Sequence, residues 1–132
     1  VSYQRVNATS TLAAFTSGTG YVPMMSKDIT TIQANSKIKI YINFTCYAGT
    51  RGSVRLRRDS TTLYTDPYAH YTDTSTIFQN YNASLIDSPS VSAGTTISYN
   101  IQVASGSGTL HFGYGDSGGG GAVVLLLTEI AA

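Results

Sequence analysis

The sequence predicts an all-β protein, an antiparallel β-sandwich of the jelly-roll or Greek-key type with about eight strands. Apolar residues recur with a period of two along most of the chain, which is typical of strands with one buried face. Good helix formers are scarce: glutamate occurs once, at Glu129, whereas Ser and Thr make up roughly a quarter of the residues. The alternating segments are short and separated by Gly, Asp, Ser and Pro turns, as in sandwiches.

Length and charge limit the classes of protein that fit. A chain of 132 residues with 42% hydrophobic residues has the size and composition of one packed domain, which we expect to span residues 1–132. Only 11% of the residues are charged and the net charge is +1, against about 25% charged residues in a typical protein. We therefore expect no nucleic-acid partner and no attraction to an anionic membrane.

Two alternating segments give the clearest strand predictions. In Lys37–Tyr47 the even-numbered residues are apolar and the odd-numbered ones are mostly polar, so one face is buried. Residues 95–104 repeat this pattern. Shorter segments of the same kind, each bounded by turn residues, lie at 28–32, 53–58, 61–64, 76–81, 83–87 and 109–114. Within 53–58, the alternation places Val54 and Leu56 inward and directs Arg55 and Arg57 to solvent.

The two ends of the chain have distinct patterns. Residues 122–130 are apolar on both faces, so this strand needs cover on two sides, from a central position between layers or from a neighbouring subunit. Residues 1–26 predict an N-terminal arm or an edge strand. Residues 1–10 have no apolar core of a signal peptide, and the run 122–127 is too short for a membrane-spanning helix. The candidate oligomer core is Val123, Val124, Leu125, Leu126 and Leu127.

One motif suggests catalysis. Residues 115–119 read Gly-Asp-Ser-Gly-Gly, the letters around the nucleophile of chymotrypsin-like proteases, which would make Ser117 the nucleophile with His70 or His111 as its base. That fold needs two barrels, and two more glycines follow the motif, so a turn is the favoured interpretation. Cys46 lies on the apolar face of a strand as a small buried residue. We predict no enzymatic activity, no metal site and no cofactor.

Two polar clusters are candidate contact surfaces. Four of the eight basic residues lie between positions 51 and 58, and residues 63–81 are rich in tyrosine. Outward arginines bind carboxylates, sulfates or phosphates, and exposed tyrosines hold sugars or form protein interfaces. For the arginines the alternatives are a solvated strand face or an ion pair at a subunit interface, and for the tyrosine-rich segment the alternative is a plain loop. The candidate receptor or interface contacts are Arg51, Arg55, Arg57, Arg58, Tyr64, Tyr68, His70 and Tyr71.

The order of several segments resembles a known family. Residues 36–40 (SKIKI), 54–60 (VRLRRDS), 85–89 (LIDSP), 95–102 and 127–132 (LTEIAA) together resemble the C-terminal β-sandwich domains of bacteriophage and prophage virion proteins. These are surface proteins of the tail-fibre, minor structural or head-decoration type. The resemblance covers about residues 27–132 and implies a non-enzymatic, usually trimeric structural protein of a virus particle. It assigns no catalytic residue.

The chain departs from the fibre pattern because it has no long N-terminal stem. We therefore expect a subunit at the virion surface that decorates or cements the capsid, made in the host cytoplasm without a signal peptide. Its expected partners are copies of itself in a homotrimer and other virion proteins such as the major capsid protein. The alternatives are a receptor-binding tail-fibre tip that contacts host surface glycan, and a stand-alone carbohydrate-binding module.

Overall fold

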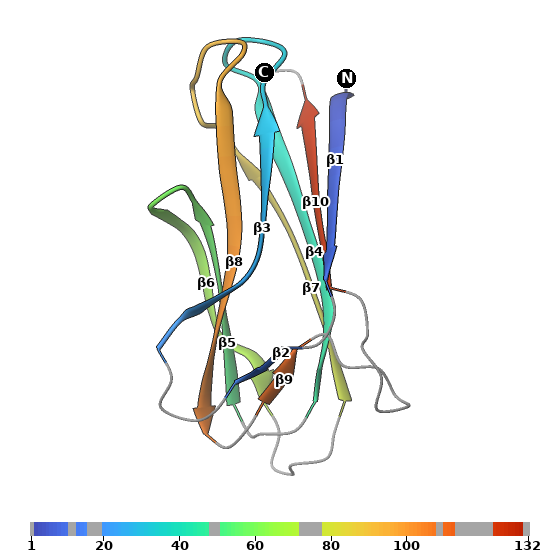
Figure 1. Cartoon of the computed structure of the whole chain (residues 1–132), viewed down its shortest axis with the longest axis vertical. Coiled ribbons are helices and arrows are strands. Elements are labelled where there is room, and N and C mark those ends of the chain that lie inside the picture. The colour runs from blue at the N-terminus through green and yellow to red at the C-terminus, as the bar shows by residue number, and fades with distance from the viewer. Residues whose placement is uncertain are drawn as a thin grey trace.

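The structure, a computed structural model, describes residues 2–10, 13–15, 20–47, 51–71, 78–107, 110–112 and 123–130. The regular elements in these ranges are strands, and they form two antiparallel sheets that face each other (Figure 1). The strands are β1 (Ser2–Ser10), β2 (Ala13–Phe15), β3 (Val22–Thr30), β4 (Lys37–Tyr47), β5 (Arg51–Arg58), β6 (Thr61–Tyr71), β7 (Phe78–Asp87), β8 (Thr96–Ser107), β9 (Leu110–Phe112) and β10 (Val123–Ile130).

The strand order is that of a jelly roll. In the first sheet, called sheet A, the long strands lie in the order β1-β10-β4-β7, and the short pair β9 and β2 continues beside the end of β4. In the second, sheet B, the order is β3-β8-β5-β6. Numbered along the chain, the eight long strands therefore have the order 1-8-3-6 in sheet A and 2-7-4-5 in sheet B, which is two Greek keys. The sequence prediction of a jelly-roll sandwich is confirmed.

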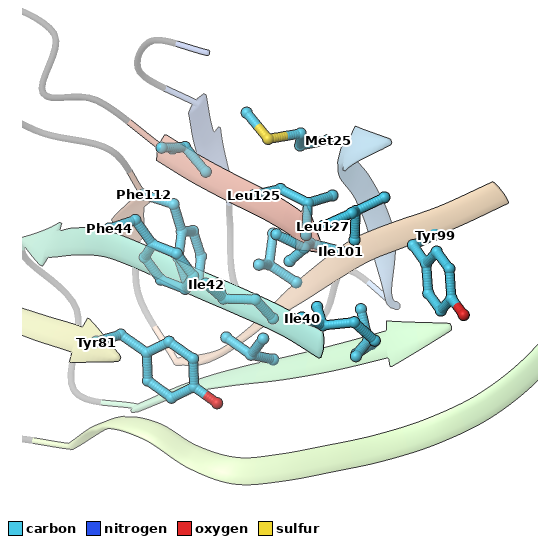
Figure 2. Close-up of a cluster of buried hydrophobic side chains, with 14 of the residues drawn as sticks. Met25, Ile40, Ile42, Phe44, Tyr81, Tyr99, Ile101, Phe112, Leu125 and Leu127 are labelled. Atoms are coloured by element: carbon cyan, nitrogen blue, oxygen red, sulfur yellow. The ribbon is translucent and has the colours of Figure 1, made fainter. Parts of the chain in front are cut away.

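The core lies between the two sheets and is built from the inward face of each long strand. On β4 the even-numbered residues from Ile38 to Cys46 are fully buried. Phe44 stacks on Tyr81 of β7 with ring centroids 5.0 Å apart and meets Phe112 of β9 edge-on at 5.7 Å. Figure 2 shows these rings at one end of the cluster and Tyr99 and Leu127 toward the other. Such interlayer packing is the main stabilising term in a sandwich.

The strand predictions from alternation are largely confirmed. β4 has the predicted bounds, and β8 and β10 differ from the predicted segments only at their ends. Residues 76–77 of the predicted segment 76–81 lie outside the described residues. Its residues 78–81 and the predicted segment 83–87 form parts of one strand, β7, because Asn82 faces outward and so continues the alternation instead of interrupting it. Of the predicted segment 109–114, residues 110–112 are described, as β9.

Two segments differ more from the sequence prediction. Residues 1–26 contribute β1 at the end of sheet A, the short β2, and the first five of the nine residues of β3. The edge-strand alternative therefore holds for β1. The predicted strand 61–64 is too short, because β6 continues through Pro67 to Tyr71. Proline is tolerated there because β6 is the edge strand of sheet B and its register shifts opposite residues 52–54.

Candidate functional site

Strand β5 presents three of the candidate arginines on the outer face of sheet B. Its inward residues Gly52, Val54 and Leu56 are buried, which confirms the predicted orientation of the strand. Arg55 donates from Nε to Gln102 Oε1 at 2.9 Å, and its guanidinium lies 4.2 Å from the ring centre of Tyr21. Arg57 donates to the carbonyl oxygen of Ser60 in the following turn. Both side chains are thus engaged within the chain.

Arg58 belongs to a bonded network that joins the two sheets. Its Nη1 lies 2.9 Å from both carboxylate oxygens of Asp87, and their side chains are 25% and 11% exposed. The hydroxyl of Tyr99, a fully buried residue of β8, donates to Asp87 Oδ2 at 2.7 Å. Burial first, and then this hydrogen bond, raise the pKa of Tyr99 above its usual value. The contacts place Arg58 in a structural role between the sheets.

Arg51, Tyr68 and Tyr71 come together in one open cleft, which we call the Arg51 cleft. The hollow has a volume of about 430 Å³, and the described residues that line it are these three. It lies where β5 begins and β6 ends, since Arg51 and Tyr71 are paired across the two strands. The guanidinium of Arg51 lies 4.7 Å from the ring centre of Tyr68. Tyr68 and Tyr71 meet edge to face, with centroids 5.9 Å apart, and each is 58% exposed.

The structure places the other two candidate contacts on β6 differently. His70 has no exposed surface, because it lies inward opposite Gly52, so its side chain cannot reach a receptor or a partner surface. This corrects its selection as a surface contact. Tyr64 is half-buried, and its hydroxyl lies 3.4 Å from Asp66 Oδ2. His70 and Tyr71 are neighbours in sequence but do not share a surface, because successive residues of a strand point to opposite faces.

Strand β10 lies inside sheet A between β1 and β4, and its two faces have different surroundings (Figure 1). Val123, Leu125 and Leu127 are fully buried against sheet B, so they belong to the chain's own core, which corrects their selection as an oligomer core. Val124 and Leu126 lie on the outer face and are half-buried. The sequence predicts that both faces of this strand need cover, and sheet B covers the inner face.

The outer face of sheet A carries a mixed apolar and amide surface around β10. Leu126 is paired with Tyr41 of β4, and Val124 with Asn43. Tyr41 is 36% exposed and donates to Asn82 Oδ1 at 2.9 Å. We call Val124, Leu126 and Tyr41 the β10 outer patch.

Glu129 is an important residue that the sequence analysis noted only as the single glutamate. It is fully buried on the inner face of β10. Its carboxylate accepts hydrogen bonds from Ile32 N at 2.9 Å, Gln33 N at 3.1 Å and Ser36 Oγ at 2.6 Å. Because residues 31–36 connect β3 of sheet B with β4 of sheet A, this one carboxylate fixes the crossing between sheets. The alternation of this segment indicates that Glu129 is buried, because it places residue 129 on the inward face together with residues 123, 125 and 127.

The candidate nucleophiles have different positions. Ser117 lies outside the described residues. Cys46 is fully buried, and burial raises the pKa of its thiol to about 12, so it is protonated at neutral pH and is not a thiolate nucleophile. In the described ranges, no three His, Cys, Asp or Glu side chains gather as a metal site would require. The described part of the chain likewise holds no helix with the length and apolar character to cross a bilayer.

Comparisons with known proteins identify no family. No protein-family model and no curated protein sequence matches the chain. The chain is similar to a chain in the structure of the infectious bursal disease virus Gx strain, with a TM-score of 0.44 and 15% sequence identity. The match covers 99% of this chain and 39% of that one, which is not a bacteriophage protein. The fold assignment therefore rests on the sheet topology described above.

Proposed function

We propose that the chain is a non-enzymatic structural module of a bacteriophage particle, a self-assembling subunit at the virion surface that decorates or cements the capsid. Its partners are copies of itself, in a homotrimer, and a virion protein such as the major capsid protein. The proposal combines the family resemblance of the ordered segments with the jelly-roll architecture. Fold alone does not assign function, so the proposal depends on a surface of the chain.

The β10 outer patch is the observation that carries this proposal. Val124 and Leu126 place aliphatic side chains on the outer face of an inner strand, beside the partly exposed ring of Tyr41. Apolar and aromatic side chains at the centre of a face, with polar residues around them, are typical of protein interfaces. The amides of Asn43 and Asn82 beside them lie 2.5 Å apart, N to O, and supply a polar margin. A second copy of the chain is the occupant we infer.

The distribution of charge supports assembly over catalysis. Arg55, Arg57 and Arg58 are engaged by Gln102, Ser60 and Asp87, so they fasten strands and turns together. The low charge of the chain also reduces repulsion between copies packed closely on a particle. Weak contacts repeated over many copies would then add up to firm attachment.

Sedimentation velocity tests the assembly step. We expect the wild-type chain to sediment as a trimer, with three times the 14.0 kDa chain mass, and Leu126→Lys to sediment as a monomer, because a buried lysine at an interface loses its hydration. The matched control is Ile32→Lys, which puts the same charge at a residue that is 53% exposed in the loop before β4. The control should remain trimeric. A monomeric wild-type chain, or equal masses for the two variants, contradicts assembly through this patch.

The second candidate function is glycan recognition, by a tail-fibre tip or by a stand-alone carbohydrate-binding module. The Arg51 cleft is the specific observation that favours it, because two tyrosine rings and a guanidinium share one hollow. Its position is compatible with the leading proposal, since the cleft is on sheet B and the β10 outer patch is on sheet A. The two surfaces can therefore be tested separately.

A further inference from the structure

We propose that the Arg51 cleft binds an acidic sugar, a pyranose ring that carries a carboxylate, such as a uronic or sialic acid residue of a glycan. The size of the cleft, about 430 Å³, falls in the range of about 300–1,000 Å³ that is usual for small-molecule sites. The proposal concerns a surface that self-assembly does not use. Its failure would leave the assembly proposal intact, and the reverse also holds.

The charge of the cleft argues for an anionic ligand. Among the described residues that line it, Arg51 is the charged one. Its Nε donates to the carbonyl oxygen of Pro67 at 3.4 Å, and its guanidinium lies against the Tyr68 ring, so both contacts are with neutral groups. Among the described residues, the recorded ion pair is Arg58 with Asp87, and Arg51 has no carboxylate partner. A guanidinium held in this way has its terminal N–H groups available for a planar anion.

The two tyrosines argue for a sugar ring rather than a simple anion. The rings of Tyr68 and Tyr71 meet at an interplanar angle of 79°, so they form two walls of a corner beside the guanidinium. Aromatic faces carry partial negative charge and attract the C–H groups on one face of a pyranose, while the phenolic hydroxyls bond to sugar hydroxyls. Both rings are more than half exposed before any ligand binds, so a ligand gains apolar contact there.

Gly106 acts as a positioning residue for Arg51. It lies on β8, which is paired with β5 at this end of sheet B. A Cβ atom at residue 106 would stand 3.0 to 3.2 Å from Cδ, Cγ and Cβ of Arg51, closer than ordinary van der Waals contact. The absence of a side chain therefore lets the stem of Arg51 lie over β8. We expect Gly106→Ala to displace Arg51 and weaken binding of the acidic sugar while the chain stays folded.

Binding of matched monosaccharides, followed by changes in NMR chemical shift, tests the proposal. The probes are glucuronic acid, which has a pyranose ring and one carboxylate, glucose, which has the ring without the carboxylate, and gluconate, an open-chain sugar acid that has one carboxylate and no ring. We expect glucuronic acid to bind at least about tenfold more tightly than either control, because only it uses the guanidinium and the rings together. N-acetylneuraminic acid is measured in parallel, to separate a sialic acid ligand from a uronic acid ligand.

Four variants connect the binding to the cleft. Arg51→Gln and Tyr71→Ala should each lower the affinity for glucuronic acid about tenfold, and Gly106→Ala several-fold, with unchanged dispersion of the amide spectrum. Ile86→Ala is the control, because it removes a side chain that is 62% exposed on β7 of the opposite sheet and belongs neither to the cleft nor to the β10 outer patch. The proposal is overturned if neither acidic sugar binds at millimolar concentration, if glucose or gluconate binds as well as the acidic sugars, or if Ile86→Ala weakens binding as much as Tyr71→Ala.

Discussion

Glu129→Ala is expected to lower the free energy of unfolding by about 3–5 kcal/mol. The substitution removes the acceptor for Ile32 N, Gln33 N and Ser36 Oγ at one time. Each donor left without a partner costs about 1–3 kcal/mol, and the three are close enough that their effects do not add fully. A domain of this size has about 5–15 kcal/mol of stability in total, so the loss is severe. Urea denaturation followed by tyrosine fluorescence measures it.

Two variants serve as controls for this prediction. Glu129→Gln keeps an oxygen acceptor of the same shape but no charge, so it should lose about half as much. Thr128→Ala changes the neighbouring residue, which points to the outer face of β10, and should change the unfolding free energy by less than about 1 kcal/mol. If Glu129→Ala is no more damaging than Thr128→Ala, the carboxylate does not hold the loop between β3 and β4.

Asp87→Ala is expected to lower the free energy of unfolding by about 2–4 kcal/mol. It leaves the buried hydroxyl of Tyr99 without its acceptor and the guanidinium of Arg58 without its ion-pair partner. The Arg58 side chain is 25% exposed, so water compensates part of its loss and the effect stays below that of Glu129→Ala. The same denaturation experiment measures this change.

Tyr99→Phe isolates one contact of the Asp87 network. It removes the hydroxyl and keeps the buried ring, so it should cost about 1 kcal/mol. The double variant with Asp87→Ala should lose less free energy of unfolding than the sum of the two single-variant losses, because both substitutions break the same hydrogen bond. Strict additivity of the two losses would mean that the hydroxyl and the carboxylate do not interact.

The faces of the strands could be predicted from the sequence because alternation records burial directly. The bounds of β4 and the inward orientation of Val54 and Leu56 follow from the alternation of polar and apolar residues along these strands. The same rule places Glu129 inward. It was not recognised as buried because a carboxylate is ordinarily assigned to solvent, and its three donors lie more than ninety positions earlier in the chain.

Contacts between strands could not be predicted, because alternation fixes faces and leaves neighbours open. Arg58 was grouped with Arg55 and Arg57 as a surface residue, whereas its role depends on Asp87 from the other sheet. Of the eight candidate contacts, Arg51, Tyr68 and Tyr71 came together because β5 and β6 form an antiparallel pair across a register shift. That shift brings Tyr68 next to Arg51, and nothing in the local sequence specifies it.

Immunogold electron microscopy of phage particles tests the proposed function most directly. Antibody raised against the chain would be applied to particles purified from the phage or prophage whose genome encodes it. We predict gold label over the capsid, in many copies per particle, because a decorating subunit repeats over the shell. Label confined to the tail tip would contradict capsid decoration and support the receptor-binding candidate. Intact particles without any label would contradict a virion role altogether.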